Sequence, residues 1–389
     1  MTIPLMLSVA GLWLACSLLA MGMLALGRAL PDGPALVFSA RQLGNWELFL
    51  MDMRAGVTRN LSRHPSPDID PAWSPDGERL AWASGRAGNM EVYLWEAGTG
   101  ALRNLTRRLQ THDFQPVWSP RGDRIAFSSV LIGEAQRGLD LYLIDLGAGT
   151  AGPLANFPNA DEFNPAWSPD GERLAFVSAQ QTGQFIYVVD VRSRAMRSLV
   201  QNLRYVPYLA WLPDGRRLVF GSQRGTVIEI SLVDVETGAR QDLTGRSGLT
   251  GILYWSLVGE RLVLWASLRG NREVYLLDVN AGEVRNVTTH PADDGPPALS
   301  PDGERLAFQS DRDGNAEIYV LDLETNALRN MSQHPSSDMD PDWSPDGDWL
   351  VFRSWRSGRP GYYALDVRTG AVYPLVNSEG DYFEYAWWP

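Results

Sequence analysis

Short apolar runs alternate with turn residues along the whole chain after its first thirty residues. Residues 306–310 and 317–322 are examples in which aliphatic and aromatic side chains dominate, and Gly, Pro, Asn and Asp stand between such runs. This pattern is typical of short β-strands joined by tight turns. It predicts an all-β protein.

The strand pattern recurs with a nearly constant period. A Trp-Ser-Pro-Asp-Gly motif or a close variant of it marks each unit, and successive Trp positions are 44 to 49 residues apart. The marked positions are Trp73, Trp118, Trp167, Trp211, Trp255, Leu299 (in the Trp slot) and Trp343. Four short strands in about 40–45 residues make one blade of a β-propeller.

The second strand of the unit gives the number of blades. It begins near Leu36, Leu80, Ile125, Leu174, Leu218, Leu262, Leu306 and Leu350, which predicts eight blades. Trp387, 44 residues after Trp343, belongs to a first strand with no blade after it. We expect this C-terminal strand to complete the N-terminal blade and close the ring, which leaves few exposed strand edges. Seven blades with one irregular unit is the alternative.

Residues 1–30 differ from the rest of the chain. Residues 3–27 carry no charged side chain, and as a helix they would span about 37 Å, enough to cross the hydrocarbon core of a membrane. The sequence therefore predicts an N-terminal transmembrane signal anchor over residues 1–30, followed by a propeller over residues 31–389. A cleaved signal peptide is the alternative. Arg28 and Arg41 follow the apolar segment, and the positive-inside rule then favours a cytoplasmic propeller.

Composition excludes several functions. The net charge of −12 argues against binding of nucleic acid, which requires a basic surface. The sequence contains no Lys, and its single cysteine, Cys16, lies in the apolar N-terminus. Lysine-based catalysis, a cysteine zinc site and a thiol nucleophile in the propeller are therefore excluded.

Residues 310–319, Ser-Asp-Arg-Asp-Gly-Asn-Ala-Glu-Ile-Tyr, and the Ser-Pro-Asp-Gly of residues 344–347 resemble the TolB-type (WD-repeat-like) propeller repeat. The resemblance extends over residues 35–389. It implies a propeller fold and, since such propellers are mostly exported, an extracytoplasmic location. TolB itself carries an α/β domain before a six-bladed propeller, and propeller peptidases carry a Gly-x-Ser-x-Gly motif that this sequence lacks.

Acidic residues recur five positions before the Trp slot, where strand order places them on one rim of the ring. They are Asp68, Asp113, Glu162, Asp294 and Asp338. They could line a site for a cation or a basic peptide, or each could pair with an Arg of its own blade. The repeat loses this acid in places and gains apolar and aromatic residues in the same loops. These are Tyr205, Tyr208, Ile252, Tyr254, Tyr382 and Phe383. An aromatic patch beside an acidic arc is typical of a protein-binding surface, whereas replacement of lost polar pairs by packing is the alternative.

The sequence thus predicts a non-catalytic, monomeric, membrane-anchored scaffold of the cell envelope that binds a protein or peptide partner. We expect no cofactor and no metal, because His64, His290 and His334 are distributed one per blade and do not converge. Two alternatives are a propeller hydrolase or lyase with its site in the central channel, and a glycan-binding surface protein.

Overall fold

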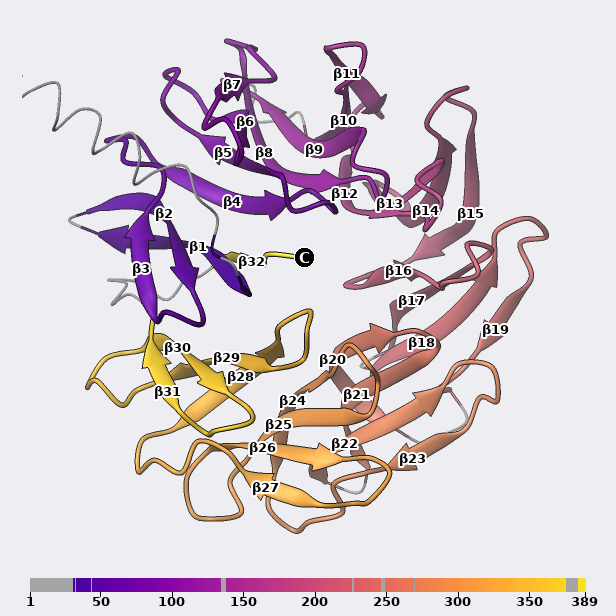
Figure 1. Cartoon of the computed structure of the whole chain (residues 1–389). Helices are drawn as coiled ribbons and strands as arrows, with labels where there is room; N and C mark the ends of the chain where they lie inside the picture. Colours follow the sequence, from indigo (N-terminus) through magenta and orange to yellow (C-terminus); the bar gives the residue numbers. More distant parts are fainter. Residues whose placement is uncertain are drawn as a thin grey trace, which may run out of the picture.

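Eight sheets of four antiparallel strands form a ring in the computed structural model (Figure 1). The structure describes residues 31, 33–42, 44–133, 138–225, 227–245, 249–268, 270–375 and 384–389, and within these ranges it contains strands and no helix. The predicted eight-bladed, all-β propeller is confirmed, and the seven-bladed alternative is excluded. The predicted membrane anchor lies outside the described residues, among which no helix is long and apolar enough to cross a membrane.

The first four blades use the N-terminal half of the chain. Blade 1 contains β1 (Ala35–Gln42), β2 (Asn45–Asp52), β3 (Val57–Asn60) and β32 (Tyr385–Trp387). Blade 2 contains β4 (Asp68–Trp73), β5 (Arg79–Ser84), β6 (Glu91–Glu96) and β7 (Leu102–Asn104). Blade 3 contains β8 (Thr111–Trp118), β9 (Arg124–Leu131), β10 (Asp140–Asp145) and β11 (Thr150–Ala155). Blade 4 contains β12 (Asp161–Trp167), β13 (Arg173–Gln180), β14 (Gly183–Asp190) and β15 (Met196–Leu203).

The other four blades follow in order around the ring. Blade 5 contains β16 (Leu209–Trp211), β17 (Arg217–Arg224), β18 (Val227–Asp234) and β19 (Arg240–Asp242). Blade 6 contains β20 (Thr250–Val258), β21 (Arg261–Leu268), β22 (Asn271–Asp278) and β23 (Val284–Asn286). Blade 7 contains β24 (Asp294–Leu299), β25 (Arg305–Ser310), β26 (Glu317–Asp322) and β27 (Leu328–Asn330). Blade 8 contains β28 (Asp338–Trp343), β29 (Trp349–Ser354), β30 (Gly361–Asp366) and β31 (Val372–Pro374).

The core lies between neighbouring blades, where both faces of each second strand are buried. The same position of six such strands holds a fully buried Phe, namely Phe38, Phe127, Phe176, Phe220, Phe308 and Phe352. Each of these side chains contributes roughly 1.5–3 kcal/mol by leaving water. Strands buried on both faces carry near-continuous apolar runs, which explains why strict alternation is weak in the sequence.

In several blades the repeated Trp forms a hydrogen bond to the preceding blade. The indole nitrogen of Trp118 donates to the carbonyl oxygen of Ala72 (2.9 Å), and that of Trp343 donates to Ala298 (3.0 Å). The Arg305 guanidinium lies over the Trp343 ring, 4.8 Å from its centre, and donates to the Gly347 carbonyl oxygen. The stacking of an Arg on the Trp of the next blade recurs at Trp118 and Trp211. The Trp of the motif and the Arg that follows the motif thus serve contacts between blades.

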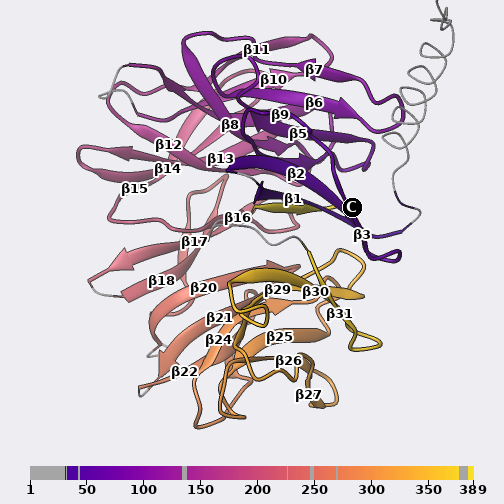
Figure 2. The ribbon, with the colours of Figure 1, turned by 90° about the vertical axis from the view of Figure 1, so that its left-hand side faces the viewer.

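The C-terminal strand closes the ring as predicted. β32 pairs with β1 through Leu36–Trp387, Val37–Ala386 and Phe38–Tyr385, and the C-terminus lies beside blade 1 (Figures 1 and 2). The indole nitrogen of Trp388 then donates to the carbonyl oxygen of Gly77 in blade 2 (3.0 Å). Blade 1 therefore combines the first and last strands of the described chain.

Deleting residues 385–389 should strongly destabilise the propeller, because it exposes β1 and the buried side chains of Leu36 and Phe38 to water. We expect the free energy of unfolding, measured by urea denaturation, to fall by about 3 kcal/mol or more. The control Trp388→Phe, which removes the indole hydrogen bond to Gly77, should cost only about 1 kcal/mol. A deletion variant as stable as the wild type would show that β32 is dispensable for the fold.

Candidate functional site

The five acids of the predicted rim are buried inside their own blades. Asp68, Asp113, Glu162 and Asp338 have no exposed surface, and Asp294 is 1% exposed. Three of them form ion pairs with an Arg of the same blade: Asp68 with Arg86 (2.9 Å), Asp294 with Arg312 (3.1 Å) and Asp338 with Arg356 (2.8 Å). A side chain without exposed surface cannot contact a docking partner. These acids therefore occupy the positions that pairing within each blade requires, and they form no exposed acidic arc.

The acids of blades 3 and 4 each accept a hydrogen bond from a hydroxyl group, and Asp113 also lies 3.7 Å from the Arg108 guanidinium. Ser129 donates to Asp113 (2.6 Å), and Ser178 donates to Glu162 (3.3 Å). Burial raises the pKa of Asp113, and it raises the pKa of Glu162 to about 8. Glu162 is therefore protonated at neutral pH.

Two of the predicted aromatic residues lie on the loop between β15 and β16. The loop is held to β17, because Gln223 and Gly221 donate backbone hydrogen bonds to the carbonyl oxygens of Tyr205 and Tyr208. Tyr205 is 50% exposed, whereas Tyr208 is half-buried. Tyr208 lines a cavity of about 550 Å³ along β12 and β16, together with Asn164, Pro165, Pro207, Leu209, Ala210, Trp211 and Leu257.

The other four predicted aromatic and apolar residues cannot be assigned a place in this surface. Ile252 and Tyr254 belong to β20, but their side chains lie outside the described structure. Tyr382 and Phe383 lie outside the described residues altogether. Only Tyr205 and Tyr208 are therefore brought together by what the structure describes.

The innermost strands carry an irregularity three residues before the Trp slot. Asp70, Gln115, Asn164 and Asp340 have φ angles of 53–55°, and the pairing of their strands shifts register at the same place. Residues other than Gly rarely adopt this left-handed conformation, which costs about 1–3 kcal/mol each. Such bulges reorient side chains and are frequent next to active sites. We call the surface formed by the innermost strands (β32, β4, β8, β12, β16, β20, β24 and β28), with Glu384 directly before β32, the inner wall; these strands surround the centre of the ring in Figure 1.

On the inner wall, two carboxyl groups from neighbouring blades meet. The backbone N–H of Asp70 donates to Glu384 Oε2 (2.9 Å), and the backbone N–H of Gln115 donates to Asp70 Oδ2 (2.8 Å). Burial, together with the adjacent Asp70 carboxyl, raises the pKa of Glu384 to about 8. Glu384 therefore holds a proton at neutral pH and can donate it, and the Asp70 carboxyl lies beside it.

Further polar groups surround this pair on one side of the inner wall. Arg353 lies 3.5 Å from the exposed Asp340 in blade 8. The Tyr385 hydroxyl donates to Asp342 (2.6 Å), and burial raises the pKa of Asp342. Blades 8, 1 and 2 thus present acids, whereas the Tyr208 cavity lies in blades 4 and 5, across the ring.

Sequence reasoning missed Asp70 and Glu384, although a signal was present. The third residue before the Trp slot differs from blade to blade, as Asp70, Gln115, Asn164, Tyr208, Ile252, Pro296, Asp340 and Glu384. A position that the repeat does not fix is free to serve a function. The sequence analysis instead followed the acids that recur five positions before the Trp slot.

The described residues contain no group of three or more His, Cys, Asp or Glu that could hold a metal ion. The histidines of the His-Pro dipeptides serve loops: Nδ1 of His64 accepts the backbone N–H of Ser66, and Nδ1 of His290 accepts that of Ala292.

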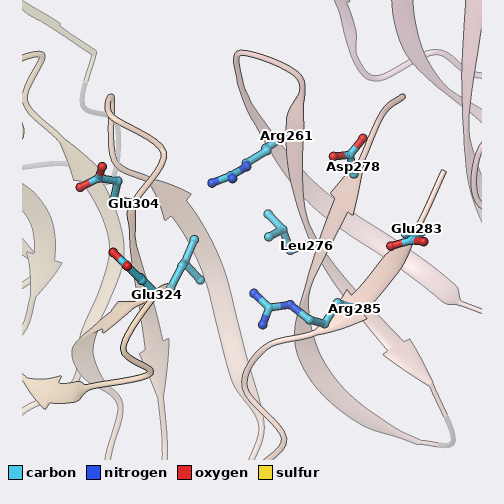
Figure 3. Close-up of a pocket in the computed structure, with 8 residues that line it drawn as sticks. Arg261, Leu276, Asp278, Glu283, Arg285, Glu304 and Glu324 are labelled. Carbon is cyan, nitrogen blue, oxygen red and sulfur yellow. The ribbon is translucent and has the colours of Figure 1, made fainter. Parts of the chain in front are cut away.

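A cavity of about 520 Å³ between blades 6 and 7 is lined by charged side chains (Figure 3). They are Arg261, Asp278, Glu283, Arg285, Glu304 and Glu324, all of them exposed. Exposed charges of both signs are stably solvated without a ligand, and we assign this cavity no function.

Many solved protein structures resemble this fold. No curated protein matches the sequence. An oligogalacturonate lyase in complex with manganese matches with a TM-score of 0.58 and 16% identity, over 90% of this chain and 99% of the lyase. The oligogalacturonate lyase of Vibrio parahaemolyticus matches with a TM-score of 0.58 and 15% identity, over 87% and 98%. Dipeptidyl peptidase 4 of Porphyromonas gingivalis matches with a TM-score of 0.69 and 12% identity, over 91% of this chain and 59% of the peptidase.

These neighbours correct one prediction. The sequence predicted a non-catalytic scaffold, because its conspicuous titratable groups follow the repeat, and that prediction is wrong: the similar propellers are those of enzymes. Asp70 and Glu384 are titratable residues at a position that the repeat does not fix. At such low identities the likeness itself establishes only the fold.

The family of the chain follows from its sequence. The model of the TolB β-propeller domain matches residues 21–138, 115–230, 225–319 and 294–389. The matches overlap, so together they extend over the whole described propeller. The chain therefore belongs to the TolB β-propeller domain family.

Proposed function

We propose that the protein is a propeller hydrolase or lyase whose acid and base are Glu384 and Asp70 on the inner wall. The observation that carries this proposal is that the Glu384 carboxyl accepts the backbone N–H of Asp70 (2.9 Å) beside the Asp70 carboxyl, with the pKa of Glu384 raised to about 8. General acid–base catalysis works best when the pKa of the catalytic group lies near the working pH. No other pair of described carboxyl groups on the inner wall has these properties.

The two groups have complementary roles. In hydrolysis, Asp70 accepts a proton from water as the oxygen attacks the substrate, and Glu384 donates its proton to the leaving group. In elimination, Asp70 removes the proton next to the bond that breaks, and Glu384 again protonates the leaving group. Both reactions consume one proton from Glu384 and place one on Asp70, so that the pair is restored by a single proton exchange. Such a pair contributes roughly 10²–10⁴-fold to the rate.

The lengths of the solved neighbours support an activity within the propeller itself. The two oligogalacturonate lyases match over 99% and 98% of their own chains, whereas the peptidase matches over 59%. This sequence also contains no Gly-x-Ser-x-Gly motif of a serine hydrolase. The lyases, which match over nearly their whole length, therefore support a site built from the strands of the propeller better than the peptidase does.

The composition of the inner wall indicates the substrate. Acids in blades 8, 1 and 2 repel anionic groups, and the Tyr208 cavity across the ring offers apolar and aromatic surface. We infer that the group bound at the reacting position is uncharged or cationic, and that it packs against the aromatic side.

We also propose that the propeller is anchored outside the cytoplasm by residues 1–30. The support is the uncharged segment over residues 3–27 and membership of a family whose propellers are mostly exported. The expected protein or peptide partner and the monomeric state stay predictions.

Asp70→Asn and Glu384→Gln should each lower kcat/KM by about 100-fold or more, because each removes one half of the acid–base pair. The assay follows cleavage of a panel of neutral oligosaccharides, oligogalacturonates and peptide amides by mass spectrometry. Glu304→Gln, on the exposed turn between β24 and β25 in blade 7, is the matched control and should keep full activity. Variants as active as the wild type on a substrate that is turned over would refute the assignment of both residues.

The activity should decline as the pH rises through about 8, because Glu384 then loses the proton that it donates. Stability should change in the same direction. Glu384 binds its proton more tightly in the folded protein, with a pKa of about 8, than in the unfolded chain, with an ordinary value of 4.5. Its contribution to stability is therefore complete below pH 4.5 and is lost between about pH 4.5 and 8.

Melting temperatures and rates measured from pH 4 to pH 9 test this. Glu384→Gln should flatten the fall of the melting temperature. The control Glu162→Gln, which removes a carboxyl of similarly raised pKa from the rim, should flatten that fall without moving the pH profile of the activity. A rate that keeps rising above pH 8 would contradict the role of Glu384 as acid.

Protease shielding of the tagged protein in intact cells, with N-terminal sequencing of the product, tests the proposed location. We expect digestion from outside with Met1 retained. Full protection until the cells are lysed would place the propeller in the cytoplasm, as the distribution of Arg28 and Arg41 favours.

A further inference from the structure

The rim of blade 5 departs from the pattern of blades 2, 7 and 8. Arg86, Arg312 and Arg356 lie in equivalent loops, are 12–14% exposed and pair with a buried Asp. In blade 5 the acid is replaced by Val206, and the equivalent Arg224 is 75% exposed. Its remaining partner is Glu229, at 3.3 Å. The loss of one buried carboxylate has therefore released an arginine to the surface.

The same blade has lost a large side chain. Blades 2, 7 and 8 hold Tyr93, Tyr319 and Tyr363 at one position of the third strand, and the loop arginine of each blade lies over that ring. Blade 5 has Ser231 there. Arg240, from β19, takes the vacant place: it donates to Ser231 Oγ (3.0 Å) and lies over Phe220, 5.0 Å from its centre.

These changes border a cavity of about 460 Å³ with an excess of positive charge. Arg204, Arg224, Arg240, Glu229 and Asp242 line it. Glu229 is paired with Arg224, and Asp242 Oδ1 accepts the backbone N–H groups of Thr244 and Gly245. Among the described residues, neither Arg204 nor Arg240 forms an ion pair. Two guanidinium groups thus face one cavity without a carboxylate partner.

We propose that this cavity binds a ligand through a carboxylate group held by Arg204 and Arg240. A guanidinium presents its N–H groups in a fixed fork that matches the two oxygens of a carboxylate. The volume accommodates a sugar acid or the terminal residue of a peptide. The loop that contributes Arg204 continues into Tyr208, which lines the cavity of the inner wall. The proposal is independent of the acid–base roles of Asp70 and Glu384.

Calorimetric titration of the full-length protein tests the proposal with two matched pairs of probes. The first pair is galacturonate and galactose, which differ by the carboxylate of a sugar. The second is a tripeptide with a free C-terminus and its C-terminal amide. We expect binding of at least one carboxylate probe, at least tenfold weaker binding of its uncharged counterpart, and weakening by salt. The pair that shows this difference identifies the source of the carboxylate.

Variants locate the site. Arg204→Gln combined with Arg240→Gln should weaken carboxylate binding at least tenfold. Ser231→Tyr should do the same, because the Tyr takes the place beside Phe220 that Arg240 now occupies. Arg368→Gln, at an arginine that is 82% exposed in blade 8, is the control. Asp70→Asn should bind normally, which separates this site from the proposed catalytic pair. Equal binding of charged and uncharged probes, absence of any binding, or unchanged binding by the double variant would overturn the proposal.

Discussion

The antiparallel pairing of β32 with β1 holds the ring closed, and the rest of the structure depends on it. Each blade buries its faces only against two neighbours, so blade 1 needs the last strand of the chain to have a complete inner edge. Closure also builds the proposed site. Glu384 directly precedes β32, and Asp70 lies on the innermost strand of blade 2, so the two carboxyl groups meet only when the ring is closed.

The repeat explains which residues are structural. The Trp, the following Arg and the rim acid each make the same contact in several blades, and burial of the acid–arginine pairs ties the rim together. Replacing one member of such a buried pair leaves an uncompensated charge, which is strongly destabilising. Where the acid is absent, as at Val206, the freed arginine becomes available at the surface. Positions that the repeat fixes therefore serve the fold, and positions at which the blades differ are free to serve function.

The fold could be predicted almost completely, because period, turn chemistry and the C-terminal Trp387 are local features of the sequence. The pairing of rim acids with Arg86, Arg312 and Arg356 was one of two interpretations that the sequence left open, since burial cannot be read from residue type alone. The Asp70–Glu384 pair could not be derived. Its members are 314 positions apart, and their contact depends on a bulge and on closure of the ring. Likewise, Arg240 reaches the place of a missing Tyr through side-chain packing that no sequence pattern specifies.

The most direct test of this account is a carbon-13 NMR titration of the Glu384 carboxyl, assigned by its loss in Glu384→Gln. The account predicts that this carboxyl titrates near pH 8 in the wild type and at a lower pH in Asp70→Asn, where the neighbouring carboxyl is gone. Titration near the ordinary value of 4.5 in both proteins would contradict it, because Glu384 would then hold no proton at neutral pH.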